Sequence, residues 1–494
     1  MFKRIKYSFV ALVAFIMVLQ GCSRKEVLEL TPEYQLDALT NPSTIDQVEQ
    51  VLTGAYSRFR NANYYGSGSG TGAGWAIMPD VLSDNLYETL ESLANSRAMA
   101  DWIYNGNTGQ ITNMYAAAYQ VIANANIVIR DVDKFATPSN QGRINRIKGQ
   151  AFAIRALAHF DLFRYWAVDY DRNSTTSLAL PYTTEFIVSS NLKPTRLSNK
   201  VYYDNLFGDI QQATTLLANV DQPINPAGRA SRPFIDLTAV HALNARVSLY
   251  AGLWSQAETA ATAAINARPL ATGAAFAGMY TESSAGEIIW NVQVESGQSG
   301  PTYLIFFPAQ QRTYFRPALE VANTSNTGLI QTNDIRYSTY FSNVGGSLAV
   351  TKYSGKGGAV DGAANFIVFR TGEMYLIRAE ARARMGGQDA AALQDLNTLR
   401  AARITGYTPV TGLSGQALLD AIANERRREL IAEGHRFFDL KRTTRTIVRG
   451  STCGNSNISP TGVCTLAPTA REWALPIPEP VRNANPNLVQ NPGY

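Results

Sequence analysis

The stretch that decides the fold reads Phe369-Arg370-Thr371-Gly372-Glu373-Met374-Tyr375-Leu376-Ile377-Arg378-Ala379-Glu380-Ala381. Apolar residues recur in it at three- and four-residue spacing between arginines and glutamates, which predicts an amphipathic helix. After Gly386-Gly387 the same spacing returns with Ala390, Leu393 and Leu396, which predicts a second helix. Two helices joined at glycines, with small residues where they cross, are typical of an antiparallel pair.

Outward from this stretch, the pattern recurs earlier in the chain. The segment from Leu237 to Ala267 also reads as one helix ending near Gly252 and a second helix after it. Such pairs resemble the tetratricopeptide repeat, and several of them must stack to bury their apolar faces. Helical periodicity also marks residues 45–60, 114–128, 147–166 and 202–217. The sequence therefore predicts a mainly α-helical protein built from tetratricopeptide-like helix pairs.

The part between Leu270 and Phe369 has a different character. Residues 271–285 are expected to form a loop, and residues 287–292 a short strand. The remainder is rich in glycine, proline and aromatic residues, so we expect it to be irregular, with few short strands. The tail from Trp473 contains five prolines, and we expect it to wrap over the surface.

The composition excludes several classes of protein. Of 494 residues, 45% are hydrophobic and 17% charged, which excludes a disordered chain. The net charge of +5 is small for this length, so we expect no nucleic-acid partner. Three scattered histidines, three cysteines and the absence of nucleotide-binding and hydrolase motifs predict no metal, no cofactor and no catalytic residue. A glycoside hydrolase would need two carboxylates roughly 5–10 Å apart, and no motif in the sequence points to such a pair.

The N-terminus predicts export. Basic residues precede an apolar run, Phe9 to Leu19, that is too short to span a bilayer and fits a signal peptide. It ends in Leu19-Gln20-Gly21-Cys22, which resembles the lipobox of bacterial lipoproteins. That resemblance implies that residues 1–21 are removed, that Cys22 carries a lipid, and that residues 22–44 form a tether. The alternative is an ordinary signal peptide that contains a cysteine, and the residues after Cys22 leave the membrane leaflet open.

Two further cysteines, Cys453 and Cys464, lie eleven residues apart in a polar loop. Export places them where disulfides persist, so we expect them to pair. Closing so short a loop contributes about 3 kcal/mol by chain-entropy reasoning. The alternative is two free thiols.

Arginines and glutamates alternate near the C-terminus. Helical spacing would let Glu429 and Glu433 pair with Arg426 and Arg436. We interpret this group as a structural ion-pair cluster that fixes the last helices to the scaffold. Nucleic-acid binding is the alternative, and the interleaved glutamates disfavour it.

The ordered set of motifs resembles the SusD/RagB family of outer-membrane lipoproteins. It comprises R-x-x-E-M-Y-L-I-R-A-E-A from Arg370, L-N-x-x-R from Leu396 and E-R-R-x-E-L-x-x-E-G-x-R-x-x-D-L-x-R from Glu425. Smaller matches agree: Tyr119/Ile122/Asn126, Gly149-Gln150-Ala151, Asp334-Ile335-Arg336, Trp473 to Pro478 and Gln490 to Tyr494. Gln150 departs from the family's usual glutamate. With the lipobox, the resemblance covers essentially the whole chain.

The resemblance implies a SusD-like α-α superhelix of four helix pairs. An N-terminal helical region, 45–268, would be followed by a C-terminal region, 269–494, with a loop-rich insert that carries the ligand surface. Family members are not enzymes. They sit on the exterior of the outer membrane, bind oligosaccharide or another nutrient, and deliver it to a SusC-like TonB-dependent transporter. Peptide capture within the family, and a periplasm-facing tetratricopeptide scaffold, remain alternatives.

A carbohydrate site needs aromatic platforms together with amide or carboxylate partners. In or beside a glycine-rich segment, Gly66 to Gly74, the candidates are Tyr65, Trp75, Asn85, Tyr87 and Trp102. Tyr303 and Tyr314 form a second group in the irregular region. Trp75 is the preferred ligand contact, because it follows glycines that we expect to form a flexible surface loop. The alternative for each aromatic residue is a place in the core.

Overall fold

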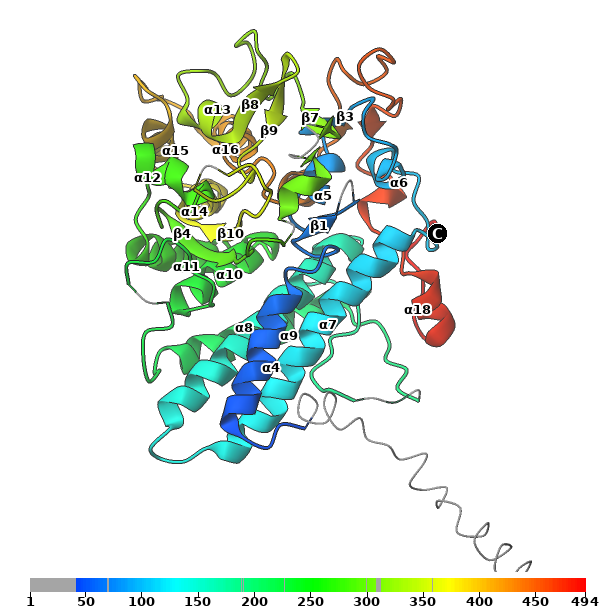
Figure 1. The fold of residues 1–494 in the computed structure, drawn as a ribbon, viewed down its shortest axis with the longest axis vertical. Helices are drawn as coiled ribbons and strands as arrows, with labels where there is room; N and C mark the ends of the chain where they lie inside the picture. The colour runs from blue at the N-terminus through cyan, green and yellow to red at the C-terminus, as the bar shows by residue number, and fades with distance from the viewer. Residues whose placement is uncertain are drawn as a thin grey trace, which may run out of the picture.

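The computed structural model describes residues 41–494 except 69–70, 188, 190, 226, 299, 308–311 and 358. Long helices dominate the first half of this range and form the elongated stack at the bottom of Figure 1. They are α4 (Ile45–Arg58), α7 (Gly109–Asp131), α8 (Gln141–Trp166), α9 (Asn199–Leu217), α10 (Leu237–Tyr250) and α11 (Trp254–Ala267). Three more complete the series in the C-terminal half: α14 (Thr371–Met385), α15 (Asp389–Arg403) and α16 (Gly415–Glu429).

The helices pack in the order of the chain. Helix α4 contacts α7, α7 contacts α8, α8 contacts α9, α10 contacts both α9 and α11, and α11 contacts α14, which contacts α15 and α16. The predicted pairs α10–α11 and α14–α15 are thus confirmed, each with left-handed glycine at its turn: Gly252 in the first, Gly386 and Gly387 in the second. The mainly α-helical class is confirmed as well.

Helix α8 is the central element of the stack. Every residue from Gly149 to Trp166 is buried, because neighbouring elements cover all of its sides. A Cβ on Gly149 would lie 2.7 Å from Cγ of Leu217 in α9, so glycine permits this close approach. The helix begins six residues before the expected Ile147, at Gln141, and its first turns include Arg143 and Arg146, which both form ion pairs with Glu49 of α4. Apolar periodicity could not reveal these polar turns.

Strands are short and paired in twos. The longest pair is β4 (Ile288–Val292) with β10 (Phe366–Arg370), antiparallel and fully buried, which confirms the expected strand. The other pairs are β1 (Ser67–Gly68) with β2 (Thr71–Gly72), β3 (Leu86–Glu88) with β7 (Phe315–Pro317), β5 (Phe306–Phe307) with β6 (Arg312–Thr313), β8 (Phe341–Val344) with β9 (Ser347–Val350), and β11 (Ile447–Val448) with β12 (Thr465–Leu466).

Short helices join these elements. They are α5 (Met78–Val81), α6 (Arg97–Ala100), α12 (Gly273–Ala277), α13 (Ile335–Tyr340), α17 (Arg436–Arg442) and α18 (Glu479–Ala484), with 3-10 turns at Val132–Phe135, Gly278–Tyr280, Pro301–Leu304 and Arg471–Trp473. The expectation of a loop over residues 271–285 is therefore wrong in part. Helix α12 and the turn after it form because Phe276, Met279 and Tyr280 are buried.

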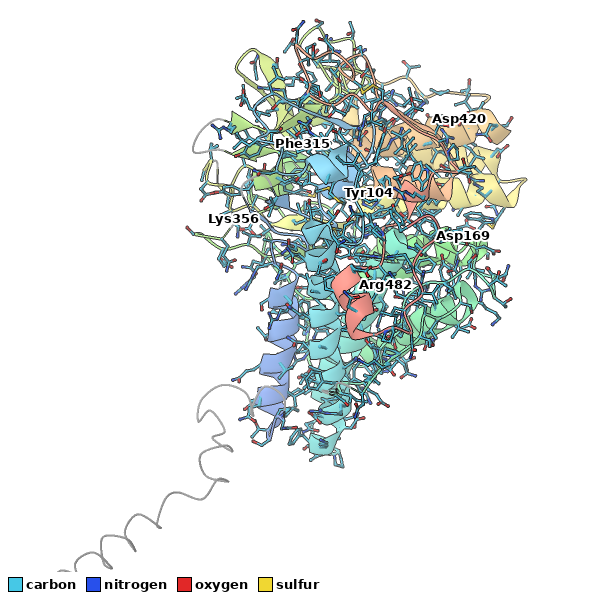
Figure 2. All side chains as sticks on the ribbon, turned by 90° about the vertical axis from the view of Figure 1, so that its right-hand side faces the viewer. Tyr104, Asp169, Phe315, Lys356, Asp420 and Arg482 are labelled. Atoms are coloured by element: carbon cyan, nitrogen blue, oxygen red, sulfur yellow. A yellow bond between two sulfur atoms is a disulfide. The ribbon has the colours of Figure 1, made fainter. Side chains whose placement is uncertain are left out.

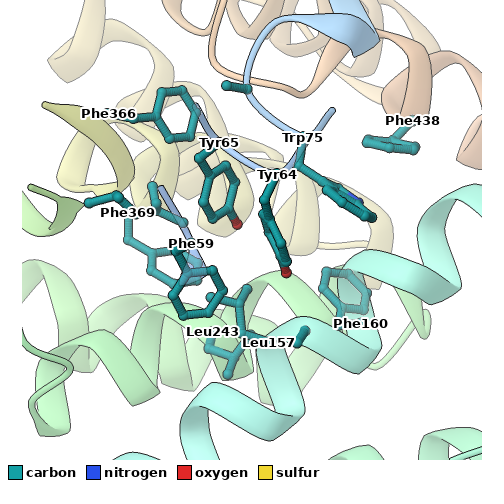
Figure 3. Close-up of a cluster of buried hydrophobic side chains, with 14 of the residues drawn as sticks. Phe59, Tyr64, Tyr65, Trp75, Leu157, Phe160, Leu243, Phe366, Phe369 and Phe438 are labelled. Carbon is teal, nitrogen blue, oxygen red and sulfur yellow. The ribbon is translucent and has the colours of Figure 1, made fainter. Parts of the chain in front are cut away.

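Aromatic side chains fill the junction between the helical stack and the loop-rich half (Figure 3). Tyr64 and Trp75 lie 4.4 Å apart between ring centroids, and Tyr65 stacks on Phe366 of β10 at 5.0 Å. The Tyr64 and Tyr65 hydroxyls both donate to the buried carboxylate of Asp161 in α8, at 2.9 and 2.8 Å. These contacts tie the N-terminal segment to the centre of the fold.

A buried ion-pair cluster links the C-terminal helices to the strands. Its acidic members are Glu287, Asp334, Glu425, Glu429 and Glu433, and its basic members are Arg336, Lys352, Arg370 and Arg403. The structural interpretation is confirmed, but the expected partners are wrong. Arg426 pairs with Asp439 and Arg436 with Asp84, because the chain turns after α16 and the two arginines then face other elements.

The C-terminal tail wraps over the stack, as expected. The Trp166 indole N–H donates to the Pro476 carbonyl at 2.9 Å, and the Asn491 amide donates to the carbonyls of Trp166 and Leu475. Figure 2 shows this face, with Arg482 of α18 in front of the helices and Tyr104 above it. In the part of the chain that the structure describes, no helix is long and apolar enough to cross a bilayer.

Candidate ligand-binding site

A groove of about 520 Å³ opens in the loop-rich half, near the top of Figure 1. We call it the Tyr87 groove. Four stretches of chain form it: strand β3, strand β7 with the turn that follows it, strand β9, and the loop after β11. Its lining consists of Tyr87, Pro317, Leu319, Glu320, Ala322, Asn323, Thr324, Ser325, Thr327, Ser347, Leu348 and Ser451.

Tyr87 is the only aromatic side chain in that lining. It lies at the middle of β3, where side chains alternate between faces, so the buried Leu86 and Glu88 point inward while half-buried Tyr87 points to the groove. Its cross-strand partner Arg316 donates to the carbonyls of Ser347 and Leu348 at 3.0 and 3.1 Å, which fixes β9 beside it. Burial raises the pKa of the Tyr87 phenol, so the hydroxyl stays protonated.

Asn323 holds the polar turn after β7, which lies across the groove from Tyr87. The Asn323 amide donates to the Leu319 carbonyl at 2.7 Å and to the Thr327 hydroxyl at 3.0 Å, and its oxygen accepts from the Thr327 backbone N–H. The Asn323 carbonyl in turn accepts from the Tyr337 hydroxyl of α13 at 3.1 Å. Because these bonds use both amide N–H groups of Asn323, what the turn presents at its surface is the exposed hydroxyls of Thr324 and Ser325.

The fourth wall is the disulfide loop. Glu320 accepts hydrogen bonds from the backbone N–H and the hydroxyl of Ser451, at 3.0 and 3.2 Å. Burial alone would raise the pKa of Glu320, but these bonds outweigh it and hold the pKa below its ordinary value. A Cβ on Gly450 would lie 2.1 Å from the Glu320 carboxyl carbon, so a larger residue there would displace the Glu320 side chain. The predicted disulfide between Cys453 and Cys464 is confirmed and closes the same loop.

The chemistry of the groove is that of a binding site for a polar molecule. It combines one aromatic ring and the side chain of Leu319 with hydroxyls, an amide and a single carboxylate, and its volume lies in the usual range for ligand sites. Among the described residues, no group of three or more His, Cys, Asp or Glu side chains is placed to hold a metal ion.

Two family models match the chain. Residues 318–494 match the SusD family, and residues 35–249 match a family described as "Starch-binding associating with outer membrane". The SusD-like protein P25 of Formosa agariphila is 24% identical over 98% of this chain and 99% of its own length. Together the two matches cover most of the chain, which is therefore similar to SusD-type proteins over most of its length.

Solved structures of SusD-like proteins show the same fold. A putative sugar binding protein from Bacteroides vulgatus has a TM-score of 0.77 and 26% identity, over 91% of this chain and 99% of that one. A SusD superfamily protein from Bacteroides thetaiotaomicron has a TM-score of 0.76 at 22% identity, over 91% and 100%.

Most of the aromatic residues proposed from the sequence lie in the core of the protein. Trp75 is 1% exposed, and its indole N–H donates to the Asp161 carbonyl at 2.9 Å; Tyr65 is 2% exposed. The expectation that Trp75 follows a flexible loop is wrong. Of the described glycines before it, Gly66, Gly72 and Gly74 serve close packing instead: β1 pairs antiparallel with β2, and a Cβ on Gly72, at φ +88°, would lie 1.9 Å from the Ala62 carbonyl oxygen.

Three other candidates are also buried. Asn85 donates to Asp80 at 2.7 Å and accepts from Arg427 at 2.9 Å, so its amide fixes the chain beneath Tyr87. The Trp102 indole N–H donates to the Leu82 carbonyl, and the Arg449 guanidinium covers its ring at 3.8 Å. Tyr314 is 2% exposed. The structure thus gives these side chains partners inside the protein and no surface for a ligand.

Tyr303 is half-buried, but its hydroxyl donates to the Asp361 carbonyl, and it does not line the Tyr87 groove. Of the aromatic candidates, only Tyr87 does so. The groove's Glu320, Asn323, Ser347 and Ser451 were missed from sequence. The polar run Asn323-Thr324-Ser325-Asn326-Thr327 within an aromatic region was the available signal. Cys22, the proposed lipid site, lies outside the described residues.

Proposed function

We propose that this protein binds oligosaccharide in the Tyr87 groove and delivers it to a SusC-like TonB-dependent transporter of the outer membrane. The observation that carries the binding role is that Tyr87 shares one groove with a rim of hydroxyl groups, on a turn that the internal hydrogen bonds of Asn323 hold in place. A sugar ring has apolar faces that pack on an aromatic ring and hydroxyls that exchange hydrogen bonds at its edge. The groove supplies both kinds of partner.

The surroundings of Tyr87 support a preformed site. Arg316 and Asn323 hold the two sides of the groove, and the disulfide loop closes its end through Ser451. Preorganised walls lower the ordering cost of binding. The matches to SusD-type families and the similarity to a putative sugar binding protein of Bacteroides vulgatus support a carbohydrate ligand.

The protein acts in this proposal as a binder and not as an enzyme. It is anchored through a lipid on Cys22 after removal of residues 1–21, with the ligand-binding half facing the cell exterior. The outer-membrane description of the second matching family agrees with this location. Ligand held over the mouth of the transporter would then be handed on for uptake.

The experiment is a calorimetric binding screen of the purified protein against neutral oligosaccharides, acidic polysaccharides and peptide mixtures. Saturable binding to a glycan, lost in Tyr87→Ala, supports the proposal. Binding to peptides alone would replace it with the peptide-capture function. No measurable binding to any of the three ligand sets would contradict nutrient capture at this groove.

A further inference from the structure

A second groove lies on the helical stack, where α9, α10 and α11 line it. Figure 1 shows these helices well away from β3 and β7. The volume of this groove is about 660 Å³, larger than that of the Tyr87 groove. Helices α9, α10 and α11 form its walls, and the turn between α10 and α11 forms one end. We call it the Trp254 groove.

The hollow follows from the sequence of α11. Its lining residues Gln256, Thr259, Ala260 and Ala263 recur at three- and four-residue spacing, so they share one helix face. These side chains are small or polar, where a helix packed against a neighbour would carry larger apolar residues. The face therefore stays open, and α9 and α10 contribute further polar side chains across it.

Trp254 differs from the other five tryptophans of the chain. Those five are buried, and each donates its indole N–H to a backbone carbonyl at 2.7–3.0 Å: Trp75, Trp102, Trp166, Trp290 and Trp473. Trp254 is partly exposed, lines the groove, and has no hydrogen-bond partner for its indole N–H among the residues described. The Arg384 guanidinium lies 5.6 Å from its ring centroid. A partly exposed indole offers a ligand both a flat apolar face and a hydrogen-bond donor.

The polar groups beside Trp254 are oriented and incompletely paired. Asn244 accepts from the Gln256 amide at 2.9 Å and from the Ser248 hydroxyl at 3.1 Å. These bonds fix the side chain of Asn244, and its own amide N–H groups find no partner within the described part of the chain. His241 lines the same wall, and neither of its ring nitrogens has a hydrogen bond to a described residue.

The groove carries no formal charge at neutral pH. None of its lining side chains is Asp, Glu, Lys or Arg. Burial lowers the pKa of His241 from its ordinary value, which outweighs the opposite effect of Asp236, so the imidazole is neutral and offers one donor and one acceptor. The Arg384 guanidinium beside Trp254 is paired with Glu380 at 3.5 Å, so its charge already has a partner. A neutral ligand rich in hydroxyls would find both donors and acceptors in the lining.

We infer that the Trp254 groove is a second oligosaccharide-binding site, in which a sugar ring packs on Trp254 and exchanges hydrogen bonds with His241 and Asn244. The class of ligand rests on the proposed function, but the site is separate from the Tyr87 groove. Two sites on one protein raise the avidity for a long glycan, because the second contact is made at high effective concentration.

The test uses the full-length protein labelled with fluorotryptophan and purified in a detergent that contains no sugar. Fluorine NMR resolves the tryptophans, and Trp254→Phe identifies the resonance of Trp254. The probes are maltoheptaose, cellohexaose, xylohexaose, mannohexaose and laminarihexaose at millimolar concentration, with a tryptic peptide mixture for comparison. Calorimetry on the same samples measures total binding.

We expect at least one oligosaccharide to shift the Trp254 resonance saturably, in the wild type and equally in Tyr87→Ala. Trp254→Ala would remove core packing as well as a ligand contact, so its effect on binding is ambiguous. A second variant, Ala263→Phe, therefore blocks the groove with a larger side chain and leaves Trp254 in place. This variant should lower the affinity reported by Trp254 about tenfold or more, the loss expected for one anchoring contact. Gln212→Phe, an exposed position of α9 outside the groove, is the matched control and should leave the affinity unchanged.

The remaining outcomes overturn the inference in distinguishable ways. A Trp254 resonance that responds to no sugar, while calorimetry still shows binding that Tyr87→Ala abolishes, removes the second site and leaves the proposed function intact. A shift that disappears in Tyr87→Ala shows that Trp254 only reports on the other groove. A response to peptides alone overturns the class of ligand. Absence of sugar binding by both methods overturns the second site and the proposed function together.

Discussion

Replacing Glu429 by glutamine tests whether the buried ion-pair cluster holds the C-terminal helices to the scaffold. The Glu429 carboxylate binds Arg336, Arg370 and Arg403, which come from α13, β10 and α15, and all four side chains are at most 1% exposed. Glutamine has nearly the same shape. It removes the charge and turns an N–H₂ group toward the guanidinium N–H groups.

We expect a large loss of unfolding free energy, because the three arginines stay buried without their counter-charge. Removing one partner of a buried ion pair costs about 3–5 kcal/mol. The free energy of unfolding, measured by guanidinium chloride denaturation with circular dichroism, should therefore fall by about 4 kcal/mol in Glu429→Gln. Glu479→Gln is the control: Glu479 pairs with Arg482 at 2.9 Å near the surface, and such pairs contribute less than about 1 kcal/mol.

The effect should also depend on pH. Burial alone would raise the pKa of Glu429, but Arg403, Arg370 and Arg336 outweigh it and hold the pKa well below its ordinary value. A carboxyl whose pKa is lowered by folding stabilises the protein fully above its unfolded pKa, about 4.3, and loses that contribution as the pH falls through the folded pKa. The difference between wild type and Glu429→Gln should therefore be constant near neutrality and shrink in acid. If Glu429→Gln were as stable as Glu479→Gln, or if the difference persisted unchanged into acid, the cluster would not hold the helices through the charge of Glu429.

Three further changes give independent checks. Trp75→Ala should lower the free energy of unfolding by about 3–5 kcal/mol, because it empties a core position; an unchanged melting temperature would show that the ring is not a core residue. Cys453→Ser with Cys464→Ser should cost up to about 3 kcal/mol and make stability insensitive to reductant, and a reductant effect of wild-type size in that variant would contradict it. Cys22→Ala should move the protein out of the membrane fraction of cells, whereas retention there would count against the lipid anchor.

Local patterns predicted the helical part of the fold well. The spacing around Leu376 and Leu396, and the glycines at 252 and 386–387, report on neighbours in sequence, and the structure confirms these pairs. The early start of α8 was missed because Arg143 and Arg146 are polar and their partner Glu49 lies almost a hundred residues away. Long-range ion pairs leave no periodic trace in a sequence.

The binding site was predictable only in part for the same reason. Whether an aromatic residue is buried depends on what covers it, and Trp75 is covered by Tyr64, Tyr165 and α8, which its own neighbours in sequence do not reveal. Tyr87 reaches a groove because β3 pairs with β7, more than two hundred residues further along the chain. The composition predicted the kind of side chain at the site but not which four segments of the chain come together to form the groove.

The central claim is that the Tyr87 groove binds oligosaccharide. The most direct measurement is the affinity of wild type, Tyr87→Phe, Tyr87→Ala and the control Tyr375→Ala, a half-buried tyrosine on α14 outside the groove, for the glycan found in the screen. We expect Tyr87→Ala to weaken glycan affinity about tenfold or more, while the affinities of Tyr87→Phe and Tyr375→Ala stay close to that of wild type. Wild-type affinity in a folded Tyr87→Ala protein would contradict the claim.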